Sequence, residues 1–359
     1  MYTLPILTYM IKSLQSLRAI GALMIFVHHF ANDNHLDGTV FQAFGDGPVT
    51  WFFMLSGFVM SIAYGESARD RSVSGHCVGM RAVAGLMISR FRRLAPLYYI
   101  GMLLMYVLLV VTHSWVIYKA LLASVLMVQS WVPDMYYFFS YDRPAWFVSD
   151  IMFCYLLFLP MQWVIERYRY GWAYLLVPVM AVYFAVAMIF GNTDNPTFNL
   201  YIIYVVPPMR IPAFLLGMLL WRVVGRMRGI SLSARAGNLL LGVTALVMTG
   251  WFVMAGNVAG CFSMSSYWWP ATALMLVALA LTDSVDCVAT RLLHLPALVS
   301  LGNASMAFYL LHRPWLSYTS WLLGSFGVEL PTAVYLPVSL LMMVGISLWV
   351  HRRFYPGRI

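Results

Sequence analysis

The stretch LRAIGALMIFVHHF, residues 17–30, decides the fold. It is mostly apolar and long enough to enter a lipid bilayer. Yet it carries Arg18 near one end and the adjacent histidines His28 and His29 near the other. Ionisable groups are expensive inside a membrane, so those within a spanning helix are candidates for function. The stretch therefore predicts a transmembrane helix with chemistry at both ends.

The composition indicates that this helix is one of many. Of the 359 residues, 62% are hydrophobic and 10% are charged, whereas about 25% are charged in soluble domains. Long apolar runs recur, and the short alternating strands of a membrane barrel are not seen. We therefore expect an all-α polytopic membrane protein, a single integral-membrane domain over 1–359 with no soluble C-terminal domain. Residues 1–12 lack the basic start and cleavage site of a removed signal peptide.

Ten runs are long enough to span a bilayer, whose hydrocarbon core is about 30 Å thick. They cover residues 14–32, 47–65, 94–112, 145–164, 172–190, 199–221, 237–256, 266–282, 297–317 and 331–350. An eleventh apolar run, at 120–132, is short. Its length is that expected of a re-entrant or interfacial segment.

The basic residues decide between ten spans and eleven. With ten spans, all of the 22 Lys and Arg residues except four fall on the side of the termini. The exceptions are Lys119, Arg143, Arg210 and Arg313. If the run at 120–132 crossed, the bias would reverse for the later loops. The positive-inside rule therefore favours ten spans with both termini in the cytoplasm.

Charge and cysteine spacing exclude two classes of function. The net charge of +9 is explained by loop charges that set topology, so we expect no nucleic-acid partner. The four cysteines form no CxxC pair and no metal-ligand spacing. We therefore expect free thiols and no metal site.

Helical geometry separates the two histidines of the first span. Arg18 and His29 are eleven positions apart, so they share one face of the helix, roughly 16 Å apart along its axis. His28 points about 100° away. We expect His29 to be functional and His28 to be an interfacial anchor; the alternative is that both histidines are anchors.

Basic residues also gather at the inner end of the third span. Arg90 and Arg93 are three positions apart and face the same way. Such guanidinium groups suit phosphates, which Arg can bind in a bidentate manner. The alternative is an ordinary positive-inside flank.

The fourth span opens with DRPAWFVSDIMFCY, residues 142–155. Trp146 is typical of a membrane interface. Asp150, beside Ser149, needs a partner inside the span, and it is a candidate to orient an imidazole or to serve as a base. The alternative is an acid that faces the positive end of the helix dipole.

Two later spans carry further polar groups. Arg210 lies within the sixth span and must pair with an acid, a bound anion or water. Ser305, Tyr309 and His312 share one face of the ninth span. The arginines at 18, 90 and 93 thus lie toward the cytoplasm and the histidines toward the outside. This order predicts a polyanionic ligand on the cytoplasmic side and chemistry nearer the outer side.

Taken together, the motifs resemble the membrane acyltransferase family 3, bacterial proteins that O-acylate extracytoplasmic carbohydrates. The resemblance covers about residues 14–350. The motifs that carry it are Arg18 with His29, FFMLSGF at 52–58, RFRRLAPLYY at 90–99, AWFVSDIMFCY at 145–155, RIPAFLLGM at 210–218 and GNASMAFYLLH at 302–312.

The resemblance implies a multi-pass protein of the bacterial inner membrane. It implies acetyl-CoA or another acyl-CoA as donor substrate, with no permanently bound cofactor, and a glycan as acceptor. Arg18, Arg90 and Arg93 would bind the donor. His29 would act as general base or acyl carrier, with Asp150 or His312 orienting it or the acceptor. Four residues would contact substrate: Trp146, Ser149, Arg210 and Tyr309.

One position departs from the family pattern. Many members carry a glutamate two residues after the serine of the fourth-span motif, where this chain has Ile151. Asp150 lies one residue earlier, so its role is less closely implied. Two other functions remain as alternatives. One is a secondary transporter or flippase, which would also place charges at the midplane; the other is a non-catalytic scaffold or sensor.

Overall fold

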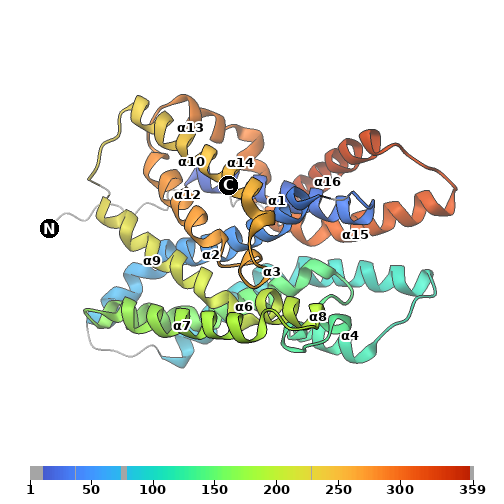
Figure 1. Cartoon of the computed structure of the whole chain (residues 1–359), viewed down its shortest axis with the longest axis horizontal. Helices are drawn as coiled ribbons and strands as arrows, with labels where there is room; N and C mark the ends of the chain where they lie inside the picture. Colours follow the sequence, from blue (N-terminus) through green and yellow to red (C-terminus); the bar gives the residue numbers. More distant parts are fainter. Residues whose placement is uncertain (1–10, 37, 74–78, 228, 356–359) are drawn as a thin grey trace.

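The computed structural model describes residues 11–36, 38–73, 79–227 and 229–355, and every regular element within them is a helix. Nine segments of this described part are long and apolar enough to cross a membrane, which confirms the polytopic all-α prediction. The long helices in Figure 1 are α1 (Lys12–Asp33), α2 (Thr39–Val73), α3 (Met80–Val111), α6 (Trp146–Arg167), α7 (Gly171–Phe190), α9 (Ile211–Met227), α10 (Ala234–Met254), α12 (Trp268–Thr282), α15 (Ser305–Ser325) and α16 (Thr332–Phe354).

Short helices and single turns join the long ones. They are α4 (Tyr118–Val125), α5 (Met135–Phe138), α8 (Pro196–Leu200), α11 (Gly260–Ser263), α13 (Val288–Leu293) and α14 (Pro296–Asn303), with a π turn at Tyr201–Val205 and 3-10 turns at Gln129–Trp131, Arg143–Ala145, Pro207–Arg210 and Ala255–Asn257. The apolar run at 120–132 falls on α4 and the turn after it. Neither element is long enough to cross the bilayer, as predicted.

Two predicted spans have the wrong bounds. The span at 199–221 is interrupted at Pro207 and Pro208, which lack the backbone N–H that a continuous helix needs, and α9 begins only at Ile211. The span at 297–317 is divided at Ala304 into α14 and α15. Helix α15 is roughly 31 Å long, but its polar residues keep it out of the nine apolar segments.

Helices α2 and α9 cross in direct backbone contact. A Cβ atom added at Gly57 would overlap the carbonyl oxygen of Phe214, and one added at Gly217 would overlap that of Met54. Small residues allow this closeness between membrane helices. The crossing fixes α2, which contributes one wall of the site.

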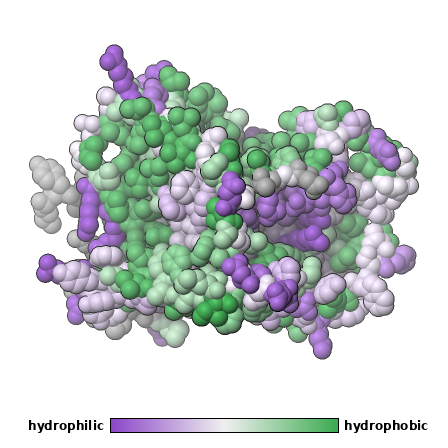
Figure 2. Space-filling view, viewed as in Figure 1, coloured by the Kyte–Doolittle hydropathy of each residue, from purple (hydrophilic) through white to green (hydrophobic). Residues whose placement is uncertain are grey.

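The outer surface divides into lipid-facing and polar parts. Large apolar side chains such as Val182 on α7 and Leu246 on α10 are exposed, as expected for helices that face acyl chains. Figure 2 shows hydrophilic residues in a hollow between the α15–α16 pair and the α3–α4 region, near the C-terminal end of α1 as drawn in Figure 1. The interior therefore opens to solvent at this end of α1.

Candidate active site

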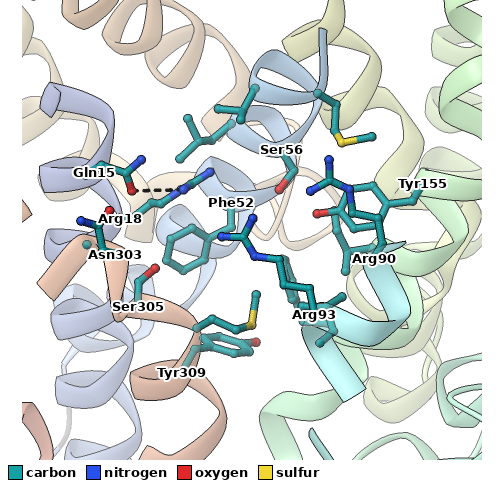
Figure 3. Close-up of a pocket in the computed structure, with 18 of the residues that line it drawn as sticks. Gln15, Arg18, Phe52, Ser56, Arg90, Arg93, Tyr155, Asn303, Ser305 and Tyr309 are labelled. Carbon is teal, nitrogen blue, oxygen red and sulfur yellow. Dashed lines mark hydrogen bonds between the residues drawn. The ribbon is translucent and has the colours of Figure 1, made fainter. Parts of the chain in front are cut away.

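A cavity of about 420 Å³ lies inside the bundle, between α1, α2, α3, α6, α14, α15 and α16. Figure 3 shows Arg18 on one wall, Arg90 on the opposite wall and Arg93 between them. None of the residues that line the cavity is acidic. The structure thus brings together the three arginines predicted to bind the donor, in a chamber suited to an anion.

Arg18 and Arg90 form hydrogen bonds with neutral groups. Arg18 Nη1 donates to Gln15 Oε1 at 3.1 Å. Arg90 Nη2 donates to the hydroxyl of Tyr64 at 3.1 Å, and the guanidinium lies over the rings of Tyr64 and Tyr155. The salt bridges between described residues do not include Arg18 or Arg90. The guanidinium groups of Arg18 and Arg90 are therefore held by neutral partners and not by a carboxylate of the described residues.

The two neighbouring histidines of α1 have different surroundings. His28 Nδ1 lies 2.7 Å from the carbonyl oxygen of Phe41, and its Nε2 lies 3.1 Å from Asn32 Nδ2. Both ring nitrogens of His28 are thus engaged, as an anchoring role requires. The ring of His29 instead lies 5.2 Å, centroid to centroid, from the ring of His312 on α15.

One backbone contact fixes the tautomer of His312. Its Nδ1 lies 2.6 Å from the carbonyl oxygen of Tyr309. A carbonyl oxygen only accepts, so Nδ1 carries the proton and Nε2 of the neutral ring keeps a lone pair. That Nε2 atom is buried and has no partner among the described residues. His312 therefore presents a bare acceptor beside His29.

Three aromatic rings pack together on the wall of the cavity, and one of them lies beside His312. Phe52, Phe147 and Tyr309 all line the cavity, and their ring centroids lie 5.3 to 6.3 Å apart. The Tyr309 ring also lies 5.9 Å from that of His312. We call these three residues the ring cluster. Through Tyr309 the cluster is in contact with His312, and through His312 with His29.

The other four predicted site residues form a separate buried cluster. The guanidinium of Arg210, fully buried, donates to the carbonyl oxygen of Tyr204 and to Ser265 Oγ, and it lies over the Trp146 ring. Asp150 is also fully buried, and both its carboxyl oxygens lack a hydrogen-bond partner. Ser149 accepts from Ser130 at 2.6 Å.

This cluster lies outside the cavity lining. Asp150 interacts electrostatically with Arg210, and no hydrogen bond among the described residues joins it to His29 or His312. Its expected pairing with an imidazole is therefore not seen. Of the residues predicted to contact substrate, the structure brings only Tyr309 to the cavity.

Sequence reasoning also missed several polar residues near the site. Gln15 and His351 line the cavity; Gln15 stands one turn before Arg18, a spacing that could have indicated it. Arg313 forms an ion pair of 2.5 Å with Asp33 at the C-terminal end of α1.

Asp142 was missed because it precedes the apolar run. Both of its carboxyl oxygens are buried without partners. Burial raises the pKa of this carboxyl well above its usual range, against the opposing charge of Arg313.

The fold and the site define a polytopic membrane protein with an internal cationic chamber and a pair of histidines in contact with one of its lining residues, Tyr309. The sequence matches the acyltransferase domain family over residues 11–352, so the chain belongs to membrane acyltransferase family 3. It is an O-acyltransferase-type enzyme. It is also similar to acyltransferase MdmB of Streptomyces mycarofaciens, with 28% identity over 340 residues, 88% of this chain and 81% of that protein. No solved structure matches it.

Proposed function

We propose that the protein transfers an acyl group, acetyl in the first instance, from cytoplasmic acyl-CoA to a hydroxyl of a carbohydrate on the other side of the bacterial inner membrane. The observation that carries this proposal is the acid-free cavity, which is lined by three arginines and by Tyr309, the ring that lies beside His312 of the histidine pair. Phosphates of the donor would bind the arginines.

The length of α1 supports this arrangement. Arg18 and His29 stand about 16 Å apart along the helix axis. The pantetheine arm of coenzyme A is thin and can bridge a distance of this order. The distribution of basic residues along the chain supports a cytoplasmic position for the arginine end. The hydrophilic hollow in Figure 2 supports entry of a polar acceptor at the opposite end.

In the proposed reaction His29 acts as general base, and His312 orients it. His29 accepts the proton of the acceptor hydroxyl as that oxygen attacks the thioester carbonyl carbon. The new ester C–O bond forms while the C–S bond breaks. The imidazolium then returns the proton to the departing thiolate, which gives the ester and free coenzyme A. For this transfer the ring cluster must move aside.

The transporter alternative has less support. The sequence shows no internal repeat that would relate the helix break at Pro207 and Pro208 to the one at Ala304, and the family match is to acyltransferases. A transporter would move its substrate without consuming acyl-CoA.

Two measurements test the proposal. Mass spectrometry of surface glycans, with and without the gene, is expected to show the loss of an acyl-group mass. Purified protein in lipid nanodiscs is expected to release coenzyme A from acetyl-CoA when extracted glycan is added. His29→Ala should lower this rate by about 10²–10⁴-fold, the usual contribution of a general base. His113→Ala, at an exposed histidine beyond α3, is the control. An unchanged rate in His29→Ala would refute the proposed base.

A further inference from the structure

A second cavity of about 470 Å³ adjoins the first. Its lining residues come from α2, α3 and the end of α16, and they are Tyr64, Ser89, Arg90, Arg92, Arg93, Phe354 and Tyr355. Arg90 and Arg93 line both cavities. We call the second cavity the outer basin. Because the two cavities share these arginines, one long ligand can occupy both.

The outer basin is built for a polyanion. Three of its lining residues are arginines and none is acidic. Arg92 is exposed and lines only the outer basin, because it points about 100° away from its neighbour Arg93 on α3. Arg92 also forms none of the salt bridges between described residues. It thus offers a guanidinium that the first cavity does not use.

The remaining lining residues are Ser89 and three aromatic residues, two of which are held by hydrogen bonds. The hydroxyl of Tyr355 donates to the backbone carbonyl of Arg93 at 2.6 Å, which ties the end of α16 to α3. Tyr64 accepts from Arg90 at 3.1 Å. Phe354 is 48% exposed. Exposed aromatic faces beside arginines suit a nucleobase, which stacks on both.

The lining also argues against a lipid headgroup. No aliphatic side chain lines the outer basin, so the two acyl chains of a phospholipid would find no apolar wall there. A base with a sugar and phosphates fits this chemistry better.

We propose that the outer basin binds the adenosine 3′,5′-bisphosphate end of coenzyme A, with Arg92 on the 3′-phosphate. Arg90 and Arg93, at the junction of the cavities, then face the diphosphate, and the pantetheine arm enters the first cavity. The inference rests on the proposed function, since it takes acyl-CoA as the donor. It adds a specificity: the enzyme distinguishes coenzyme A from its 3′-dephospho form through Arg92.

The test compares kcat/KM for acetyl-CoA and for 3′-dephospho-acetyl-CoA in nanodiscs. The native protein is expected to prefer acetyl-CoA by about tenfold or more, as one charge-assisted contact gives. Arg92→Gln should lower kcat/KM for acetyl-CoA by a similar factor and leave the dephospho donor unchanged. Arg352→Gln removes an equal charge near the basin without lining it, and it should keep the native ratio.

A second readout does not need turnover. Adenosine 3′,5′-bisphosphate should bind the native protein in calorimetry at least tenfold more tightly than adenosine 5′-monophosphate, and Arg92→Gln should remove the difference. An unchanged donor ratio in Arg92→Gln would overturn the assignment while leaving the proposed function intact. The assignment would also be overturned if anionic phosphatidylglycerol in the nanodisc displaced adenosine 3′,5′-bisphosphate, because the basin would then bind lipid. If the native protein consumed neither donor, the proposed function itself would fail.

Discussion

The ring cluster should limit the length of the acyl chain that the enzyme accepts. Phe147 lines the cavity as part of the ring cluster, and its ring contacts those of Phe52, Phe53 and Tyr309. Phe147→Ala removes the phenyl ring and opens space for about two more methylene groups of an acyl chain. Burial of each methylene contributes about 0.8 kcal/mol, so two contribute about 1.6 kcal/mol, or roughly 15-fold in relative kcat/KM.

The assay measures kcat/KM with acetyl-CoA and butyryl-CoA under identical conditions. Phe147→Ala should shift the butyryl-to-acetyl ratio upward by roughly 15-fold. Loss of a buried phenylalanine also costs about 3–5 kcal/mol of stability, so the control must carry the same loss. Phe158→Ala provides it, because Phe158 is fully buried but lines neither cavity. If both variants showed the native ratio, the acyl group would not lie against Phe147.

Three further predictions concern the arginines, the helix crossing and the buried carboxyl. Arg18→Gln removes a guanidinium that would bind the phosphates of the donor, so it should raise KM for acetyl-CoA about tenfold or more with a smaller change in kcat. A KM equal to that of the native enzyme would contradict this. Gly217→Val should destabilise the protein by about 1–3 kcal/mol through overpacking, whereas Gly242→Val, at a position with open space around it, should not; thermal unfolding in detergent compares them. Burial raises the pKa of the Asp142 carboxyl in the folded protein above its usual value of 3.8. As pH rises, this carboxyl therefore ionises in the unfolded chain before it does in the folded protein. The free energy of unfolding should fall above about pH 3.8, by up to about 1.4 kcal/mol per pH unit. Asp142→Asn should remove this fall, and parallel slopes in unfolding midpoints from about pH 4 to about pH 8 would contradict it.

Hydropathy was sufficient to predict a polytopic all-α protein, because a bilayer imposes both length and apolarity. It predicted ten spans, whereas nine segments of the described residues are long and apolar enough to cross. It was not sufficient where the backbone breaks. The apolar runs continue through Pro207 and through Ala304, but the helices do not. Helix α15 carries His312 and Arg313 within its span, so its length and its hydropathy disagree.

Helical periodicity gave the face of each side chain but not its neighbour. It placed His29 on the face of Arg18 and separated it from His28, and the hydrogen bonds of His28 agree with that separation. It could not tell that Asp150 turns toward Arg210, because the phase of one helix does not specify which helix packs against it. For the same reason, periodicity could not predict the contact between His29 and His312, which lie on helices at opposite ends of the chain.

The ring cluster also bears on the electrical insulation of the membrane. Under the proposed function the enzyme takes its donor from one side of the membrane and delivers the product to the other, and such an enzyme risks becoming a conduit for protons and small ions. Packed Phe52, Phe147 and Tyr309 rings offer such ions no replacement for their hydration shell, and charge movement through an apolar region is costly. With these rings in the proposed path, the protein is expected to remain in an energised membrane without dissipating the proton gradient.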